Sequence, residues 1–454
     1  MNVLEINSGD TAWILTSAAL VLLMTPGLAF FYGGMVRAKG VLNMMMMSFI
    51  SMGVIGVLWV LFGFSMAFGN SVGGLGVIGN PFEFAGLNGL MANDPDAAYP
   101  ALAFVAFQAC FAIITVALVS GALADRASFG GWTLFAVLWG TFVYFPAAHW
   151  VFAFSNDDGS VVGGWIANQV QAIDFAGGTA IHINAGVAAL ALALVVGPRI
   201  GFGSKPMRPH NMTLVMLGAA LLWFGWFGFN AGSAAAANGL ASLAWVNTLA
   251  ATAAAMLGWL IVEKMRDGHP TSLGAASGIV AGLVGITPAA GSVSPIGALL
   301  IGVAAGVACA YAVGLKFKFG YDDSLDVVGV HLVGGLVGTL LIGLLADPAV
   351  SGDPAEPATA GLFYGGGFDQ LWRQAVGAAA VMAYSVVVSY LIAQIVKHTV
   401  GWRVSTTDEL GGIDLAEHSE SGYDLSPVYY SSRVSRTLVM TKDDLADDKT
   451  GVMK

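Results

Sequence analysis

Two stretches of the chain, DFAGGTAIH at residues 174–182 and DSLDVVGVH at residues 323–331, decide how it folds. Each stretch places a histidine eight residues after an aspartate and inside a long apolar segment. Ionisable groups at membrane depth are costly and are usually functional. At about 1.5 Å per helical residue, each histidine lies about 12 Å from its aspartate along a helix, close to the middle of a ~30 Å hydrocarbon core. We therefore expect His182 and His331 to meet.

The composition of the chain is typical of a polytopic membrane protein. Of its 454 residues, 57% are hydrophobic and 10% are charged, and the mean hydropathy is +0.76. Such a chain has too little polar surface to cover a soluble globule. The net charge of -10 comes largely from loops and the tail, so it does not indicate a nucleic-acid partner. Cys110 and Cys309 lie among apolar residues, which favours two buried thiols over a disulfide or metal pair.

Apolar runs of about 20 residues, the length that crosses a lipid bilayer as a helix, recur along the chain. The segment before the first run has no basic residue, so we expect a retained span rather than a cleaved signal peptide. The fold class is therefore all-α, with a transmembrane domain over residues 1–400 and a polar tail over residues 401–454. We predict eleven transmembrane helices, near residues 11–32, 42–68, 100–123, 131–152, 177–197, 211–232, 240–262, 271–289, 295–315, 325–346 and 371–396.

Lysine and arginine gather in every second loop, which sets the orientation of the spans. This pattern places the N-terminus outside and the C-terminal tail in the cytoplasm, in a multi-pass protein of the cell membrane. Five spans separate comparable elements, and an odd number inverts a repeated unit in the membrane. We predict two inverted five-helix repeats, over about residues 11–197 and 211–346, followed by a final helix near residues 371–396.

His182 and His331 are the first candidates for chemistry. Neutral imidazole has one donor and one acceptor nitrogen, so two adjacent rings can share a proton in a hydrogen bond. Burial favours the uncharged ring, and such a pair can pass a proton without storing a stable charge. Two alternatives remain, a purely structural pair and a zinc site. The zinc site is disfavoured because the chain has no HExxH motif and no obvious third ligand at membrane depth.

Aromatic residues gather near the expected outer ends of three spans. Several aromatic rings and one hydroxyl at a common face can hold a small cation by cation–π attraction and a hydrogen bond. Packing against lipid or core is the alternative for these faces. Phe107 and Phe111 are four residues apart on one helix face, a spacing that Phe229 and Ser233 repeat. The fourth span ends on the same side with Trp150 and Phe152.

Asp174 and Asp323 lie just before their helices, where the positive end of the helix dipole favours a carboxylate. Helix capping is the simpler interpretation for Asp323. For Asp174, which lies at the expected outer end, we add an electrostatic effect on a bound cation.

At these residues the chain resembles the ammonium transporter family, which includes bacterial Amt, fungal Mep and animal Rh proteins, and it is most similar to Amt. The resemblance implies eleven spans, arranged as two inverted halves plus a final helix, in a homotrimer with one pore per subunit. It implies no enzyme activity, no cofactor and no bound metal. The match runs from about Thr11 to Tyr423 over ordered segments, TPGLAFFYGGMVR, AFQACF, DFAGGTAIHINAG, GWFGFNAGSA, GITPAAG, DVVGVH and GGIDLAEHSESGY.

The resemblance also implies roles for individual residues. His182 and His331 match the twin pore histidines, and Thr287 resembles a threonine near the pore. Phe111 and Phe229 resemble a stacked aromatic gate. The outer cation site is expected to involve Phe107, Trp150, Phe152, Asp174 and Ser233. The family commonly has tryptophan where this chain has Phe152, and phenylalanine has a weaker cation–π face. Recruitment is then weaker, or Trp150 contributes from another angle.

These features predict transport of ammonium and methylammonium. Moving an intact cation into a low-dielectric medium costs tens of kcal/mol in the Born limit. Potassium cannot avoid that cost, whereas ammonium can release a proton and cross as ammonia. The proton either returns outside or follows through the two histidines, and we favour the second route.

Two other classes of protein remain as alternatives, an ammonium sensor that signals through its tail and a membrane enzyme with a histidine-bound metal. The tail resembles the segment on which PII-type signal proteins regulate the family, so we expect such a partner at the cytoplasmic face. The stretch after Tyr423 carries no motif that we recognise.

Overall fold

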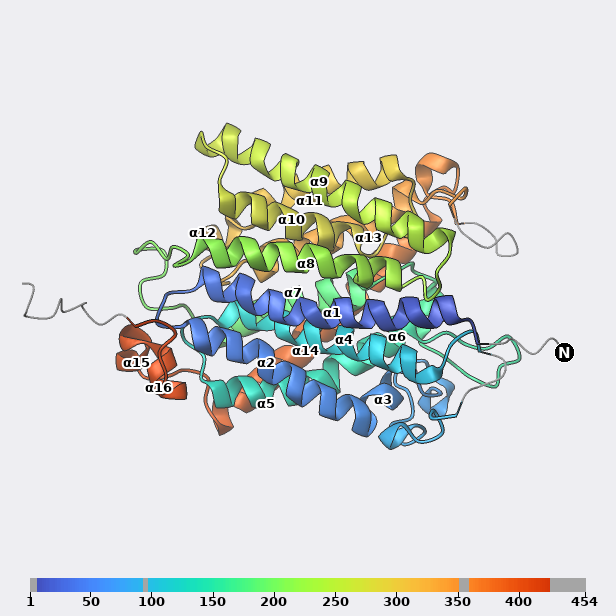
Figure 1. Cartoon of the computed structure of the whole chain (residues 1–454), viewed down its shortest axis with the longest axis horizontal. Coiled ribbons are helices and arrows are strands. Elements are labelled where there is room, and N and C mark those ends of the chain that lie inside the picture. The colour runs from blue at the N-terminus through green and yellow to red at the C-terminus, as the bar shows by residue number, and fades with distance from the viewer. Residues whose placement is uncertain (1–5, 93–96, 351–358, 425–454) are drawn as a thin grey trace, which may run out of the picture.

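A computed structural model of the chain describes residues 6–92, 97–350 and 359–424. Over these ranges the secondary structure is helical, and the β-type contacts are three isolated bridges. The long helices run side by side as one bundle (Figure 1). The first helix begins, at Ser8, at one end of the bundle and the helices of the tail lie at the other, so we call these the N-terminal end and the tail end.

All eleven predicted spans are helical in the described part of the chain. The shortest of them is α10 (Ser272–Ile286), which is apolar and has 15 residues. The other ten are long and apolar enough to cross a membrane: Ser8–Met35, Val41–Phe68, Ala101–Leu123, Phe129–Phe152, Gly178–Val196, Met212–Gly232, Gly239–Asp267, Pro295–Phe319, Val328–Leu345 and Asp369–Thr399.

Several spans change helix type along their length. Wide π-helical turns form η1, η5, η7 and η8 within the spans, and such turns often occur at functional sites. The elements of the spans are α1 (Ser8–Met35), α2 (Val41–Leu58), η1 (Trp59–Gly63), α3 (Phe64–Phe68), α4 (Ala101–Val119), η4 (Ser120–Leu123), α5 (Phe129–Trp139), η5 (Gly140–Tyr144), α6 (Phe145–Phe152), η7 (Gly178–Ile183), α7 (Asn184–Val196), α8 (Met212–Gly232), α9 (Gly239–Asp267), α10 (Ser272–Ile286), α11 (Pro295–Ala312), α12 (Leu315–Phe319), η8 (Val328–Leu332), α13 (Val333–Leu345) and α14 (Asp369–Thr399). The connecting loops hold η2 (Val72–Gly74), η3 (Ala85–Leu87), η6 (Ile166–Val170) and η9 (Leu362–Tyr364).

Many of the helices begin at a polar side chain that accepts a hydrogen bond from their first backbone amides. Such a cap satisfies N–H groups that have no partner within the helix. The capping residues are Asn7 for α1, Ser128 for α5, Asn211 for α8, Asn238 for α9, Thr271 for α10 and Ser294 for α11.

Helices α1 and α8, the first spans of the two predicted repeats, pack against each other in opposite directions. Trp13 near the start of α1 donates from Nε1 to the carbonyl of Ala231 near the end of α8, at 3.1 Å. At the other end, the amide of Asn211 donates to the carbonyl of Gly34, at 3.1 Å. An antiparallel pairing of this kind is what an inverted repeat requires. The residue boundaries of the two repeats stay a prediction.

The two histidine-bearing spans cross at glycines. A Cβ atom added to Gly186 of α7 would lie 2.4 Å from the backbone nitrogen of Leu332, and one added to Gly335 of α13 would lie 3.0 Å from the side chain of Ile183. Small residues allow such close approach between membrane helices. The crossing brings η7 and η8 into contact in the interior of the bundle.

The first part of the tail folds onto the tail end of the bundle as α15 (Thr406–Gly411) and α16 (Ile413–His418). The Asp414 carboxylate accepts hydrogen bonds from the amides of Leu42 and Asn43, at 3.0 and 2.8 Å, and so caps α2. Glu417 accepts a hydrogen bond at 2.7 Å from the amide of Phe129, the first residue of α5. These contacts tie the tail to two spans. The tail after residue 424 lies outside the described residues.

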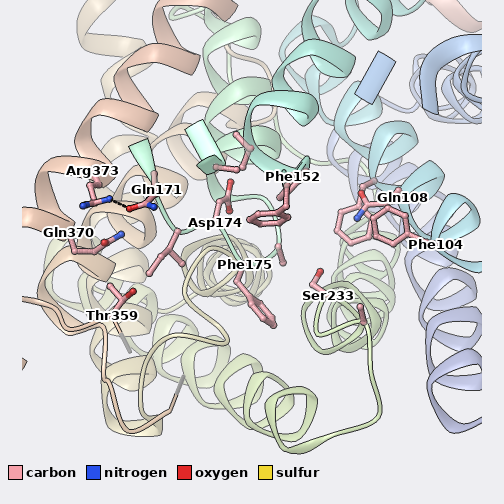
Figure 2. Close-up of a pocket in the computed structure, with 18 of the residues that line it drawn as sticks. Phe104, Gln108, Phe152, Gln171, Asp174, Phe175, Ser233, Thr359, Gln370 and Arg373 are labelled. Carbon is pink, nitrogen blue, oxygen red and sulfur yellow. Dashed lines mark hydrogen bonds between the residues drawn. The ribbon is translucent and has the colours of Figure 1, made fainter. Parts of the chain in front are cut away.

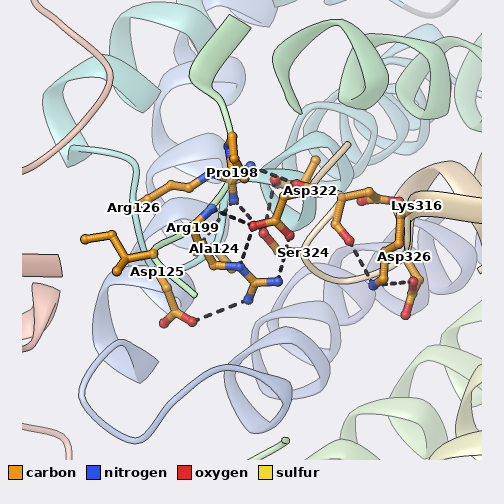
Figure 3. A network of polar contacts seen from close by, with 12 residues as sticks. Ala124, Asp125, Arg126, Pro198, Arg199, Lys316, Asp322, Ser324 and Asp326 are labelled. Carbon is orange, nitrogen blue, oxygen red and sulfur yellow. Dashed lines mark hydrogen bonds and ion pairs between the residues drawn. The ribbon is translucent and has the colours of Figure 1, made fainter. Parts of the chain in front are cut away.

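A buried polar network joins the loops at the tail end (Figure 3). Arg199 binds Asp322 through two nitrogens, at 2.9 and 2.8 Å, and Arg37 pairs with Asp125 at 3.1 Å. Burial works to raise the pKa of Asp322, but the Arg199 guanidinium outweighs it and holds that pKa below its ordinary value. The Arg199–Asp322 pair therefore remains ionised at neutral pH. Together with the Arg37–Asp125 pair, it joins the loops between α1 and α2, α4 and α5, α7 and α8, and α12 and η8.

Candidate pore and substrate pocket

His182 lies in η7 and His331 lies in η8, and their side chains meet in the interior of the bundle. Their Nδ1 atoms are 3.3 Å apart, within hydrogen-bonding distance. The two ring centroids are 5.3 Å apart and the ring planes differ by 28°, so the rings meet at their Nδ1 edges. Both residues are buried, with 1% and 4% of their surface exposed. The meeting of the two rings is the one expected from the spacing of the sequence.

Two carboxylates hold the π-helical turns on which the histidines lie. Asp174 accepts four backbone hydrogen bonds of 2.6–3.1 Å, from the amides of residues 177–180. Asp323 accepts two, from the amides of Val327 and Val328, at 3.1 and 2.7 Å. Burial raises the pKa of Asp174, and the four amides oppose that rise. Capping is thus the structural role of both residues.

A pair of phenylalanine rings lies next to the histidines. The centroids of Phe111 and Phe229 are 4.4 Å apart, and the Phe229 centroid is 6.0 Å from that of His182. Beyond these rings is a cavity of about 10 Å³, which is lined mainly by apolar side chains. That volume corresponds to about one water-sized molecule. The cavity wall includes Leu28, Ile114, His182, Trp226, Phe229 and His331.

A pocket of about 1010 Å³ lies on the other side of the phenylalanine pair, at the N-terminal end of the bundle, and its lining includes Phe111. Phe152, Asp174 and Ser233 also line it (Figure 2). Ser233 donates its hydroxyl proton to the carbonyl of Phe229, at 2.8 Å, so the lone pairs of its oxygen remain available to a donor. Asp174 also lines the pocket, although its oxygens are occupied by amides. Five of the predicted residues therefore share one pocket, Phe107, Phe111, Phe152, Asp174 and Ser233.

Trp150 does not line this pocket. Its indole N–H donates to the carbonyl of Val77 at 2.7 Å, and its ring packs against Trp165 and Tyr384 with centroid distances of 5.6 and 4.7 Å. The structure therefore places Trp150 outside the pocket that Phe107 and Phe152 line.

Thr287 is buried, and it does not line the 10 Å³ cavity. Its Oγ1 atom accepts a hydrogen bond at 2.8 Å from the indole nitrogen of Trp226, which does line the cavity. Thr287 therefore touches the pore only through another side chain. No group of three or more potential metal ligands occurs within the described ranges, so the zinc alternative gains no support there.

The sequence interpretation missed two residues of the site. Gln108 lines the large pocket and is the polar residue of the AFQACF segment, where it directly follows Phe107. Trp226 lines the small cavity and lies nearly parallel to His182, at a centroid distance of 5.4 Å and an angle of 22°. Trp226 is three residues before Phe229, so the periodicity of an α-helix already places both on one face.

Residues 12–423 match the Ammonium Transporter Family. The chain belongs to the ammonium transporter family. An ammonium transporter of Mycobacterium tuberculosis is 62% identical over 441 residues, which cover 92% of this chain and 91% of that protein. An ammonium transporter of Aquifex aeolicus is 47% identical over 423 residues, covering 93% and 95% of the two chains.

Solved structures of the family have the same fold. The crystal structure of Saccharomyces cerevisiae Mep2 matches with a TM-score of 0.81 and 32% identity, and the match covers 94% of each chain. The structure of a sensor Amt protein matches with a TM-score of 0.81 and 28% identity, covering 90% of this chain and 98% of that one. This ammonium transporter is therefore a helical multi-pass membrane protein that transports ammonium and is not an enzyme, as predicted.

Proposed function

We propose that ammonium is recruited at the large pocket, loses a proton near the phenylalanine pair and crosses as ammonia, while the proton passes through His182 and His331. The observation that carries this mechanism is the 3.3 Å contact between two Nδ1 atoms inside an otherwise apolar passage. A hydrogen-bonded imidazole pair supplies a proton path where the lining offers few other polar groups.

Recruitment rests on the side chains that share the pocket. The faces of Phe107 and Phe152 attract a cation, and the lone pairs of Ser233 accept a hydrogen bond from it. The Asp174 carboxylate, already bound by four amides, contributes through its charge rather than as a direct ligand. With phenylalanine at residue 152, the attraction is weaker than a tryptophan ring would give.

Selectivity rests on the apolar passage between the phenylalanine pair and the histidines. An intact cation in this passage loses its hydration shell and gains few polar contacts in return. Desolvation favours the neutral form of an amine, by roughly 3 to 5 pKa units in buried sites, so ammonium can give up a proton at this point. Potassium has no proton to release. The passage therefore separates the two cations by chemistry rather than by diameter.

The passage of the proton through His182 and His331, which we call the relay, makes transport electrogenic. The proton released at the phenylalanine pair moves to the neutral imidazole pair and on toward the tail end, and ammonia follows through the cavity. A charge that crosses the membrane gains ~2.3 kcal/mol for each ~100 mV of membrane potential, which drives accumulation of ammonium.

Flux and current in proteoliposomes test this function. We expect gradients of ammonium and methylammonium to drive both substrate uptake and inward current, and a potassium gradient to drive neither. Uptake of ammonium without current would contradict the relay while leaving transport intact. Binding of ammonium that alters a partner at the tail without any flux would instead support a sensor.

The place of the cationic residues supports an orientation of the protein in the membrane. The cations Arg37, Arg126 and Arg199 lie at the tail end, which supports a cytoplasmic tail and an N-terminal end that faces outside. We further propose a homotrimer with one pore per subunit, and a PII-type signal protein as a partner of the tail. Protease access to the tail in sealed vesicles of known orientation tests the first of these proposals.

A further inference from the structure

The His182 ring makes one hydrogen bond to protein, which leaves its orientation underdetermined. Its Nδ1 atom faces His331, and its Nε2 atom is buried without a hydrogen-bond partner among the described residues. The torsion between Cβ and an imidazole ring is broad, so a ring with one hydrogen bond can tilt or turn over. Either motion would take Nδ1 away from His331. A neighbouring group must therefore hold the ring plane.

The indole of Trp226 is that neighbour. Its ring lies nearly parallel to the His182 ring, with 5.4 Å between centroids and 22° between planes. Trp226 is 2% exposed, so its N–H group needs a hydrogen-bond partner within the protein. That partner is the Oγ1 atom of Thr287, at 2.8 Å.

Thr287 acts as the acceptor in its hydrogen bond with Trp226. Its hydroxyl donates to the carbonyl of Leu283 at 2.7 Å, one turn earlier in α10. The single hydroxyl proton is thereby committed, so the remaining lone pairs accept from the Trp226 indole. Since Trp226 comes from α8 and Thr287 ends α10, the bond fixes the indole against a second helix.

We infer that Thr287 and Trp226 are positioning residues, which hold the His182 ring in the plane where it shares a proton with His331. This inference rests on the proposed relay and deepens it. The phenylalanine ring of Phe229 also lies nearly parallel to His182, but it is farther away, at 6.0 Å, and has no polar atom through which another helix could hold it.

The test replaces Thr287 with valine, which keeps the shape and removes the acceptor. We expect the maximal ammonium-driven current in proteoliposomes to fall about tenfold, since small misplacements of reacting groups cost up to ~100-fold in rate. The half-saturation concentration should stay unchanged because the recruiting pocket is untouched. Thr287→Ser, which restores the hydroxyl, should restore the current.

Thr248 provides a matched control. Its Oγ1 atom also donates to a carbonyl one turn earlier, Ala244 at 2.6 Å, and accepts from a side chain of α8, Asn230 at 2.9 Å. Thr248→Val removes the same kind of buried hydrogen bond away from the histidines, so we expect the current to persist. If both valine variants lose current equally, the effect is general destabilisation and the inference is overturned.

A second variant covers the case in which Thr287→Val does not fold. Trp226→Phe keeps an aromatic face and removes the N–H group, so it should lower the current, and adding Thr287→Val should lower it no further. Full current in Trp226→Phe would overturn the inference.

Full current in Thr287→Val with a collapsed current in His182→Leu would overturn the role of Thr287 and Trp226 alone. Wild-type protein that carries ammonium flux without current would overturn the relay, and the positioning pair with it.

Discussion

Asp174 and Asp323 are equivalent residues at opposite ends of the passage. Each accepts hydrogen bonds from the first amides of the π-helical turn that bears a histidine. Asp174 accepts four such bonds and Asp323 accepts two. Buried carboxylates that accept several amides are strong helix caps. The position of each histidine in the bundle therefore depends on an aspartate eight residues before it.

Protonation of Asp323 should stabilise the fold. Burial raises the pKa of Asp323 to about 6, while Lys316 opposes the rise. A carboxyl whose pKa is higher in the folded state than in the unfolded chain destabilises the fold when it ionises. Stability is then greatest below pH ~4 and declines as the pH rises through ~6. We expect the Tm in detergent to fall from pH 4.5 to pH 7.

Asp323→Asn should remove much of that decline, because its amide oxygen can still accept from Val328 and cannot ionise. Asp157→Asn, on an exposed loop, serves as the control and should follow the wild-type pH profile. Identical pH profiles for Asp323→Asn and wild type would show that another group titrates.

Replacing either histidine should abolish the ammonium-driven current. His182→Leu and His331→Leu keep much of the volume and remove both ring nitrogens, so the proton loses its path while the barrier to potassium stays high. The double variant should be no worse than either single variant, as expected of groups that act as one unit. Electrical recording in proteoliposomes measures this, with a potassium gradient as the leak control. Wild-type current in both single variants would make the pair purely structural.

Changes in the large pocket should alter affinity. Ser233→Ala should raise the half-saturation concentration of ammonium. The expected loss of apparent binding free energy is about 0.5 to 1.5 kcal/mol, the net value of one hydrogen bond. Phe152→Trp should lower it, since tryptophan has the stronger cation–π face. Trp150→Phe should leave it unchanged, because Trp150 lies outside the pocket lining. The proposed site fails if Ser233→Ala and Phe152→Trp both match wild type.

Deleting the chain from Gly411 onward should leave a folded protein and abolish any response to a PII-type partner. The deletion removes the Asp414 cap of α2 and the Glu417 contact with α5, at a cost of about 1 kcal/mol for each lost cap. The buried bundle supplies most of the stability. Pull-down of the partner measures the loss, and Asp414→Ala separates uncapping from loss of the segment. Full-strength capture by the truncated protein would contradict this prediction.

The sequence predicted the spans from the length of their apolar runs, and it predicted the meeting of the histidines from their distance along the helix. The direction of a side chain around the helix was harder to predict. Trp150 and Phe152 are two residues apart, so their side chains point about 160° apart around an α-helix, toward nearly opposite faces. The sequence predicted both at a cation site, whereas in the structure Phe152 lines the large pocket and Trp150 packs against Trp165.

Two further features could not be predicted from local sequence. The π-helical turns at η7 and η8 leave the apolar pattern of their spans unchanged, so composition does not reveal them. The bond between Trp226 and Thr287 joins residues that are 61 positions apart on different helices. Such a pairing depends on how α8 and α10 pack, and only the three-dimensional arrangement reveals it.

The cavity beside the histidines, at about 10 Å³, holds one water-sized molecule, and the phenylalanine pair closes the side toward the large pocket. An unbroken file of water needs several adjoining cavities of that size. On the proposed mechanism, we therefore expect the passage to be an osmotic barrier. Vesicles that contain the protein should swell in dilute medium no faster than protein-free vesicles, in which case a cell would import nitrogen through this pore without gaining water through it.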